Sequence, residues 1–132
     1  MTNPPALENI RVGDCMNPGI LSCSANTPLG EVAGIMTKHR VHAVAVTDVD
    51  GTHPIGVASA LDVVAAAVSG EEPTALQAAA TEHLSVSSGE SLHRAGQLMA
   101  EYSVSHLIVL DASSGEPVGV LSTLDIASVY AH

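Results

Sequence analysis

The stretch Gly56-Val57-Ala58-Ser59-Ala60-Leu61-Asp62-Val63 decides the fold of this chain, because it occurs twice. It returns 63 residues later, without a gap, as Gly119-Val120-Leu121-Ser122-Thr123-Leu124-Asp125-Ile126. Between residues 22–66 and 85–129, 13 of the 45 aligned pairs are identical. Such a repeat predicts two copies of one unit of about 60 residues. Because a unit that small buries little surface alone, we expect the copies to pack on each other about a pseudo-two-fold axis.

The composition limits the class of protein. The chain has 132 residues, 46% of them apolar, which suffices for one compact domain or two small ones. A formal charge of −10 with only four basic residues argues against binding of nucleic acid or an anionic membrane. The two cysteines, Cys15 and Cys23, fit neither a CxxC metal pair nor a disulfide framework. Without an apolar leader or a long apolar run, the chain is expected to be cytoplasmic.

Turn and helix signals predict the same order of elements in both copies. We expect each copy to run strand-helix-strand-strand-helix and to form a three-stranded mixed sheet backed by helices, a mixed α/β (α+β) fold. Thr27 is the expected N-cap of the first helix, with Pro28 at its first position, and Asn17-Pro18-Gly19 is typical of a turn. The expected strands are 20–23, 41–47, 54–58, 83–86, 104–110 and 117–121, and the later helices are 60–68, 73–80, 91–102 and 123–130.

These signals also divide the chain into four parts. Residues 1–10 form an N-terminal arm, 11–68 repeat one, 69–73 a linker and 74–132 repeat two. The strand at 41–47 is apolar at nearly every position, which predicts burial on both faces.

The repeated Gly-h-h-Ser-x-x-Asp pattern, in which h is apolar, lies where a strand passes into a helix. Ser59 and Ser122 are expected at helix N-caps, with Asp62 and Asp125 at the third helical position. This spacing is that of a capping box, which satisfies backbone N–H groups that have no helical partner. The same geometry suits a ligand, because a helix N-terminus attracts anions and a carboxylate accepts two hydrogen bonds from the vicinal hydroxyls of ribose. The residues alone leave both interpretations open.

Two further features accompany this pattern. The apolar strands end in Asp48 and Asp111, and Val12-Gly13-Asp14-Cys15-Met16 precedes the first copy. Over about residues 11–130 the chain thereby resembles a tandem pair of CBS domains, also called a Bateman module. The resemblance implies the CBS fold and a regulatory ligand that contains adenosine, such as AMP, ADP, ATP or S-adenosylmethionine.

The resemblance also implies two ligand sites, each with contacts from both copies. In this family the ribose-binding Asp of one copy faces the adenine-binding strands of the other. One site would then combine Ser122, Thr123 and Asp125 with Ile20, Leu21, Arg40, His42 and Ala43. The other would combine Ser59 and Asp62 with His83, Leu84, Ser105 and His106. Because Arg40, His42 and Thr123 supply a cation and donors, we expect a phosphate to prefer the Asp125 site.

The predicted function is that of a non-enzymatic sensor that acts in trans on an unidentified protein partner. Adenine nucleotide, most simply AMP, is the expected ligand, and neither a metal site nor a catalytic residue is expected. The Ala- and Val-rich helices at 60–68 and 123–130 predict a homodimer. The alternative is a structural pairing module with degenerate, empty sites. It is favoured by Ala60, the counterpart of Thr123, and by Ala45 and Ile108, which stand where many CBS domains have proline.

Overall fold

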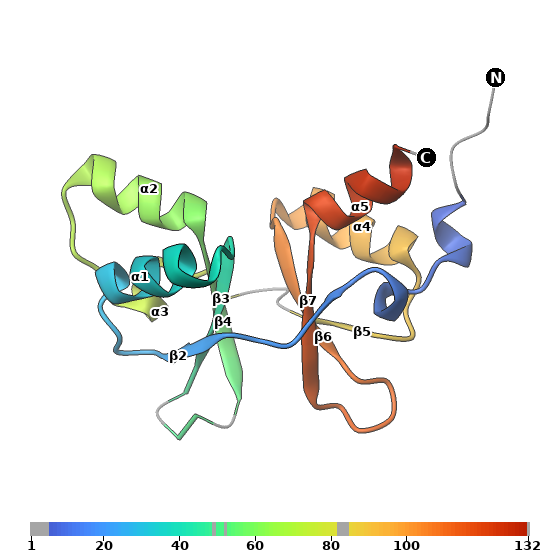
Figure 1. Ribbon diagram of the computed structural model, residues 1–132, viewed down its shortest axis with the longest axis horizontal. Coiled ribbons are helices and arrows are strands. Elements are labelled where there is room, and N and C mark those ends of the chain that lie inside the picture. The colour runs from blue at the N-terminus through green and yellow to red at the C-terminus, as the bar shows by residue number, and fades with distance from the viewer. Residues whose placement is uncertain (1–5, 49, 52, 82–84, 132) are drawn as a thin grey trace. The chain divides into compact units, whose positions relative to one another are not determined.

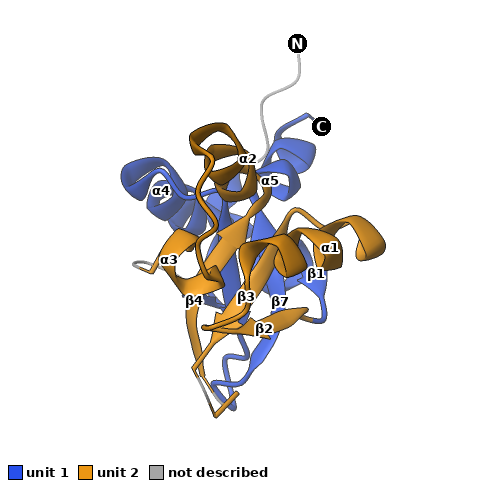
Figure 2. Cartoon of the chain, turned by 90° about the vertical axis from the view of Figure 1, so that its left-hand side faces the viewer, with its two compact units in different colours: residues 1–19, 85–132 blue, residues 20–84 orange. Residues whose placement is uncertain are grey.

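The computed structural model describes residues 6–48, 50–51, 53–81 and 85–131, which belong to two compact units. Unit 2 is the continuous segment 20–84, whereas unit 1 combines residues 1–19 with residues 85–132 (Figure 2). The units therefore cross the sequence repeats, since the residues that lead into repeat one belong with repeat two.

Unit 2 is a three-stranded sheet with helices packed against it (Figure 1). Its strands lie in the order β2-β3-β4, with β2 parallel to β3 and β3 antiparallel to β4. Helix α1 contacts β3 and α2, and α3 contacts both β2 and β4. Its elements are β2 (Ser22–Ser24), α1 (Leu29–His39), β3 (Ala43–Thr47), β4 (Pro54–Ser59), α2 (Ala60–Ser69) and α3 (Ala75–Ala78).

Unit 1 repeats this plan and adds one strand. Its sheet has the order β1-β7-β6-β5, with β5 parallel to β6 and the other neighbours antiparallel. Its elements are the 3-10 helices η1 (Leu7–Asn9) and η2 (Val12–Asp14), β1 (Asn17–Pro18), β5 (Ser85–Ser87), α4 (Leu92–Tyr102), β6 (His106–Leu110), β7 (Pro117–Ser122) and α5 (Thr123–Tyr130). The mixed α+β fold with two repeated units is thus confirmed, and even the strand irregularity recurs, at Val46/Thr47 and at Val109/Leu110.

Each unit has its own apolar core. In unit 2 the stripe of α1 covers β3, whose three central residues are all buried, as the sequence predicts. In unit 1 the stripe of α4 packs on β6 in the same way, and Val12 of the lead-in segment is fully buried among these residues. The buried residues shared by the two plans are Leu29, Val32, Met36, Val44 and Val46 in unit 2 and Leu92, Ala95, Met99, Leu107 and Val109 in unit 1.

Two local predictions are wrong. Asn17-Pro18-Gly19 is not simply a turn, because Asn17 and Pro18 form β1, in register with Val120 and Gly119 of β7. The N-cap of α1 is Pro28 and not Thr27, and no side chain in the described part of the chain caps this helix. The Thr27 hydroxyl instead lies 3.0 Å from the Ser24 hydroxyl, and its carbonyl accepts a 2.7 Å hydrogen bond from the N–H of Ala75.

The remaining element boundaries shift by a few residues. The short helix predicted at 73–80 is α3, capped by Thr74, and the predicted strand at 83–86 is observed as β5, starting at Ser85. Within the described ranges, no helix is long and apolar enough to cross a membrane.

Candidate functional site

The two Ser-x-x-Asp segments form capping boxes, as predicted. Ser59 caps α2 and accepts a hydrogen bond from the N–H of Asp62, while the Asp62 carboxylate accepts one from the N–H of Ser59. Ser122 and Asp125 form the same reciprocal pair at α5. Each carboxylate is thus fixed at the end of an antiparallel strand and at the N-terminus of a helix.

The two carboxylates have different partners. In unit 2, Oδ2 of Asp62 accepts hydrogen bonds from the Ser59 N–H at 2.8 Å and from the Ser59 hydroxyl at 3.0 Å. In unit 1, Oδ2 of Asp125 accepts a 2.7 Å hydrogen bond from the Ser122 N–H. The side-chain amide Nδ2 of Asn17 then lies 3.3 Å from Oδ1 and 3.2 Å from Oδ2 of Asp125. Asn17 was not among the predicted site residues.

Strand β1 brings Asn17 to this place, and a glycine permits the approach. A Cβ atom added to Gly119 would lie 2.5 Å from the carbonyl oxygen of Asn17 and 2.8 Å from the sulfur of Met16. Real Cβ atoms do not come so close to backbone, so the glycine of the repeated motif is required for β1 to pair with β7. The N–H of Gly19, beyond β1, donates a 3.0 Å hydrogen bond to the carbonyl of Val118.

Unit 2 contains the counterpart of this contact without the amide. Ala80 forms an antiparallel bridge with Val57, through hydrogen bonds of 2.9 and 3.0 Å. Since Asn17 pairs with Val120, the same offset of 63 residues relates both members of the two pairs. Gly56 again permits the approach, with Ala79 Cβ and the Ala80 carbonyl 3.0 and 3.3 Å from an added Cβ. The lead-in bridge therefore belongs to the repeat, and Ala80 stands where Asn17 stands in unit 1.

The other predicted site residues of unit 2 lie near the Ser59 cap or along the edge that leads to it. Ala43 pairs with Ser59, and the carbonyl of His42 accepts a 2.8 Å hydrogen bond from the N–H of Ala60. Arg40 ends α1 in a left-handed conformation, with φ 55°, and its side chain is exposed. Leu21 accepts a 2.9 Å hydrogen bond from the N–H of Ala45, while the side chains of Leu21 and Ile20 are partly buried.

Unit 1 groups its predicted residues in the same way. His106 pairs with Ser122, and the N–H of Thr123 donates a 3.0 Å hydrogen bond to the carbonyl of Ser105. The Ser105 hydroxyl lies 2.8 Å from Nδ1 of His106. The structure thus brings the Ser and Asp of each repeat together with the second-strand residues of the same repeat. The pairings expected between the repeats stay predictions, and His83 and Leu84 lie outside the described residues.

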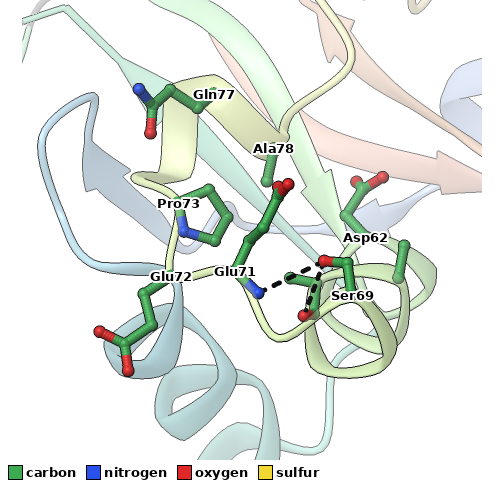
Figure 3. A pocket seen from close by; sticks show the side chains of 9 residues that line it. Asp62, Ser69, Glu71, Glu72, Pro73, Gln77 and Ala78 are labelled. Atoms are coloured by element: carbon green, nitrogen blue, oxygen red, sulfur yellow. Dashed lines mark hydrogen bonds between the residues drawn. The ribbon is translucent and has the colours of Figure 1, made fainter.

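A hollow of about 660 Å³ in unit 2 opens beside Asp62 (Figure 3). One wall is formed by α2, and the other by the segment after it and by α3. The figure shows the side chain of Glu71 reaching along the hollow toward Ala78, while the Glu72 carboxylate points away from them. Its lining residues are Asp62, Ala65, Ala66, Ser69, Glu71, Glu72, Pro73, Gln77 and Ala78. Its charged lining residues are acidic, so it favours neutral or cationic groups over phosphates.

The described residues also limit the chemistry of the site. No group of His, Cys, Asp or Glu among them is arranged to hold a metal ion. Cys15 and Cys23 are free thiols. Burial raises the pKa of both thiols, and the charges of Asp14 and Asp125 raise that of Cys15 further. Both sulfurs are therefore held as neutral thiols at pH 7, a form that is weakly nucleophilic.

Comparison with known proteins agrees with this fold. A CBS domain profile matches residues 12–69 and again residues 77–132. A search of curated proteins finds no match.

Several solved structures share the fold at low sequence identity. The CBS domain pair of protein MJ0100, in complex with 5′-methylthioadenosine and S-adenosyl-L-methionine, matches with a TM-score of 0.80 and 20% identity, over 92% of this chain and 95% of that one. The CBS domain protein PAE2072 from Pyrobaculum aerophilum, complexed with AMP, matches with a TM-score of 0.78 and 24% identity, over 93% and 100% of the two chains. CBSX2, in complex with AMP, matches with a TM-score of 0.70 and 21% identity, over 91% and 95%. The two profile matches show that this chain belongs to the CBS domain family and carries two of its domains in tandem.

Proposed function

We propose that this CBS domain pair is a non-enzymatic sensor that binds an adenosine-containing ligand and acts in trans on a protein partner. The observation that carries the proposal is the pair of carboxylates, Asp62 and Asp125, each fixed by a capping box at a helix N-terminus. A carboxylate held in this way can accept hydrogen bonds from both hydroxyls of a ribose. The AMP complexes of PAE2072 and CBSX2 and the S-adenosylmethionine complex of MJ0100 support this ligand class.

Calorimetric titration with AMP and S-adenosylmethionine tests the proposal. We expect Asp62→Ala and Asp125→Ala each to weaken binding at its own site by about 1–3 kcal/mol, because hydrogen bonds to a charged group are lost. Glu101→Ala is the matched control, since it removes an exposed carboxylate on α4, far in sequence from either cap. Because Asp125 also caps α5, the melting temperature of each variant is measured without ligand as well. Equal affinities of the wild type and of both variants would contradict the assignment.

We further propose that the chain is a cytoplasmic homodimer. Both C-terminal helices of the repeats expose large apolar side chains: Leu61 and Val68 of α2 are 73% and 84% exposed, and Leu124 and Tyr130 of α5 are 71% and 65% exposed. A second copy is the simplest cover for two such helices, because the repeat gives both the same unpartnered face. The molar mass measured by light scattering at micromolar concentration should exceed the 13.4 kDa of one chain.

One observation favours the alternative, a structural pairing module with an empty site. The Asp125 carboxylate already has a side-chain donor in Asn17. If neither AMP nor S-adenosylmethionine raises the melting temperature while the protein is dimeric, this second function replaces the first, because a ligand of the folded state must stabilise it.

A further inference from the structure

We infer that Asn17 is a specificity-determining residue, which competes with a ligand's ribose hydroxyls for Asp125 and leaves Asp62 as the carboxylate that a diol reaches first. The inference rests on the proposed function, the binding of an adenosine-containing ligand. It adds that one of the two candidate carboxylates is more available to the ligand than the other. Its basis is the position of the Asn17 amide, 3.3 and 3.2 Å from the two carboxylate oxygens of Asp125.

The near-equal distances locate the amide on the outer edge of the carboxylate. A vicinal diol donates one hydrogen bond to each oxygen of a carboxylate, from that same edge. The Ser122 N–H already takes one acceptor position of Oδ2 from the helix side. The Asn17 amide therefore stands in for the two hydroxyls, and a ribose can bind Asp125 through both oxygens only after this amide has moved away.

Among the described residues, no side-chain amide contacts the Asp62 carboxylate. Both of its hydrogen bonds, from the Ser59 N–H and the Ser59 hydroxyl, reach Oδ2, and within the described residues Oδ1 of Asp62 accepts none. The residue at the equivalent position of the bridge is Ala80, whose methyl group cannot donate. A single side chain thus separates two carboxylates that the repeat otherwise holds in the same way.

The contact is built so that it forms readily and can be displaced. Pairing of β1 with β7 orders the Asn17 backbone, so that only the side chain has to be ordered to reach Asp125. The contact is exposed to solvent, which lets a ligand compete for the carboxylate by rotation of one side chain. A hydrogen bond of this kind is expected to change ligand affinity by about threefold to tenfold.

Titration of the ¹⁵N-labelled protein with adenosine and with AMP tests the inference, because the amides of Asp62 and Asp125 report on each carboxylate separately. In the wild type, Asp62 should respond at lower concentration than Asp125 to adenosine, which carries the diol without a phosphate, because the acidic residues beside Asp62 disfavour the phosphate of AMP. This order is the reverse of the preference for the Asp125 site that the sequence predicts for a phosphate.

Asn17→Ala should lower the dissociation constant read at Asp125 about threefold to tenfold and leave that at Asp62 unchanged. Ala80→Asn is the reciprocal variant and should raise the dissociation constant read at Asp62. Asn17→Leu replaces the amide by an apolar group with the same branching and serves if Asn17→Ala loosens β1.

The analogue 2′,3′-dideoxy-AMP identifies the competing group. It has neither hydroxyl, so Asn17→Ala should give it no gain in affinity at Asp125, and a gain equal to that of AMP would overturn the inference. Binding of AMP with Asn17→Ala and Asn17→Leu equal to or weaker than the wild type would also overturn it, while the proposed function would stand. Absence of any response to AMP in all proteins would instead overturn the proposed function, and the competition with it.

Discussion

Asp62 and Asp125 occupy the same position of one repeated motif, yet their carboxylates are not equally available. Both close a capping box with the serine three residues before them. Asp125 also contacts the amide of Asn17, whereas the equivalent residue beside Asp62 is Ala80. A repeated motif can therefore fix the position of a functional group without fixing its hydrogen-bond partners. The decisive residue lies in the lead-in bridge, outside the stretch in which the repeat is obvious.

Substitution of the motif glycines Gly56 and Gly119 should give the largest difference in stability between equivalent changes in the two units. In Gly119→Ala the new methyl group would lie 2.5 Å from backbone oxygen, so β1 must leave β7 and Asn17 must leave Asp125. In Gly56→Ala the nearest atom, at 3.0 Å, is the Cβ of Ala79, and a small shift relieves it. We expect Gly119→Ala to lower the free energy of unfolding by about 3 kcal/mol or more and Gly56→Ala by about 1 kcal/mol.

Urea unfolding followed by circular dichroism measures both variants. The opposite order, with Gly56→Ala the more damaging, would show that the lead-in bridge of unit 1 contributes little to stability. An equal loss in both variants would show that the backbone contact at Gly119 is no tighter than that at Gly56.

Removal of the two N-cap hydroxyls should give a smaller difference in stability between the units than the glycine substitutions do. The Ser59 hydroxyl both accepts a hydrogen bond from the Asp62 N–H at 3.3 Å and donates one to the Asp62 carboxylate at 3.0 Å. Among the residues that the structure describes, the Ser122 hydroxyl only accepts one, from the Asp125 N–H at 3.2 Å. Loss of an N-cap hydroxyl costs about 1 kcal/mol. We expect Ser59→Ala to destabilise the protein more than Ser122→Ala, by a few tenths of a kcal/mol beyond that value. Thermal unfolding of the two variants, with Ser128→Ala on α5 as the control, checks the order.

The smallest expected effect on stability comes from the turns that follow the buried strands β3 and β6, and this effect depends on pH. The Asp111 carboxylate accepts hydrogen bonds from the N–H and hydroxyl of Ser114 and from the N–H of Ser113, which lower its pKa below the usual value. Because these bonds favour the ionised form, their stabilisation is complete above the unfolded pKa of about 4 and is lost as the pH falls through the lower folded pKa.

Comparison of the wild type with Asp111→Asn isolates this charge. The difference in melting temperature should be constant above pH 5 and should disappear below the folded pKa, where Asp111 is protonated and resembles asparagine. Asp48 is the equivalent residue of repeat one, and Asp48→Asn provides the parallel measurement. A difference for Asp111→Asn that persists unchanged at pH 2 would contradict the role of ionisation.

The sequence predicts the structural features that depend on neighbouring residues and that occur in both repeats. Both capping boxes and the bounds of α5 are as expected, because serine, three-residue spacing and an apolar run together specify a helix start. Thr27 has the same local signal, but its carbonyl and hydroxyl bind Ala75 and Ser24 instead. These contacts come from the tertiary structure, so the N-terminus of α1 could not be read from its own residues.

The role of Asn17 was missed for a similar reason. Asn-Pro-Gly has turn chemistry, and the strand that pairs with it lies more than 100 residues later. One signal was nevertheless available. Extension of the 63-residue offset upstream aligns Asn17 with Ala80, so that a hydrogen-bond donor in one copy stands where the other copy has a small apolar residue.

The division of the chain into units also sets the order in which it can fold during synthesis. Unit 2 is complete once residue 84 has been made, whereas Leu7, Ile10 and Val12 must wait for the core residues Leu107 and Leu121 of unit 1. Joining the two segments of unit 1 closes a loop of 65 residues, 20–84, whose entropy makes early pairing unfavourable. These three apolar residues precede unit 2 in the chain and are therefore buried only after unit 2 has been made.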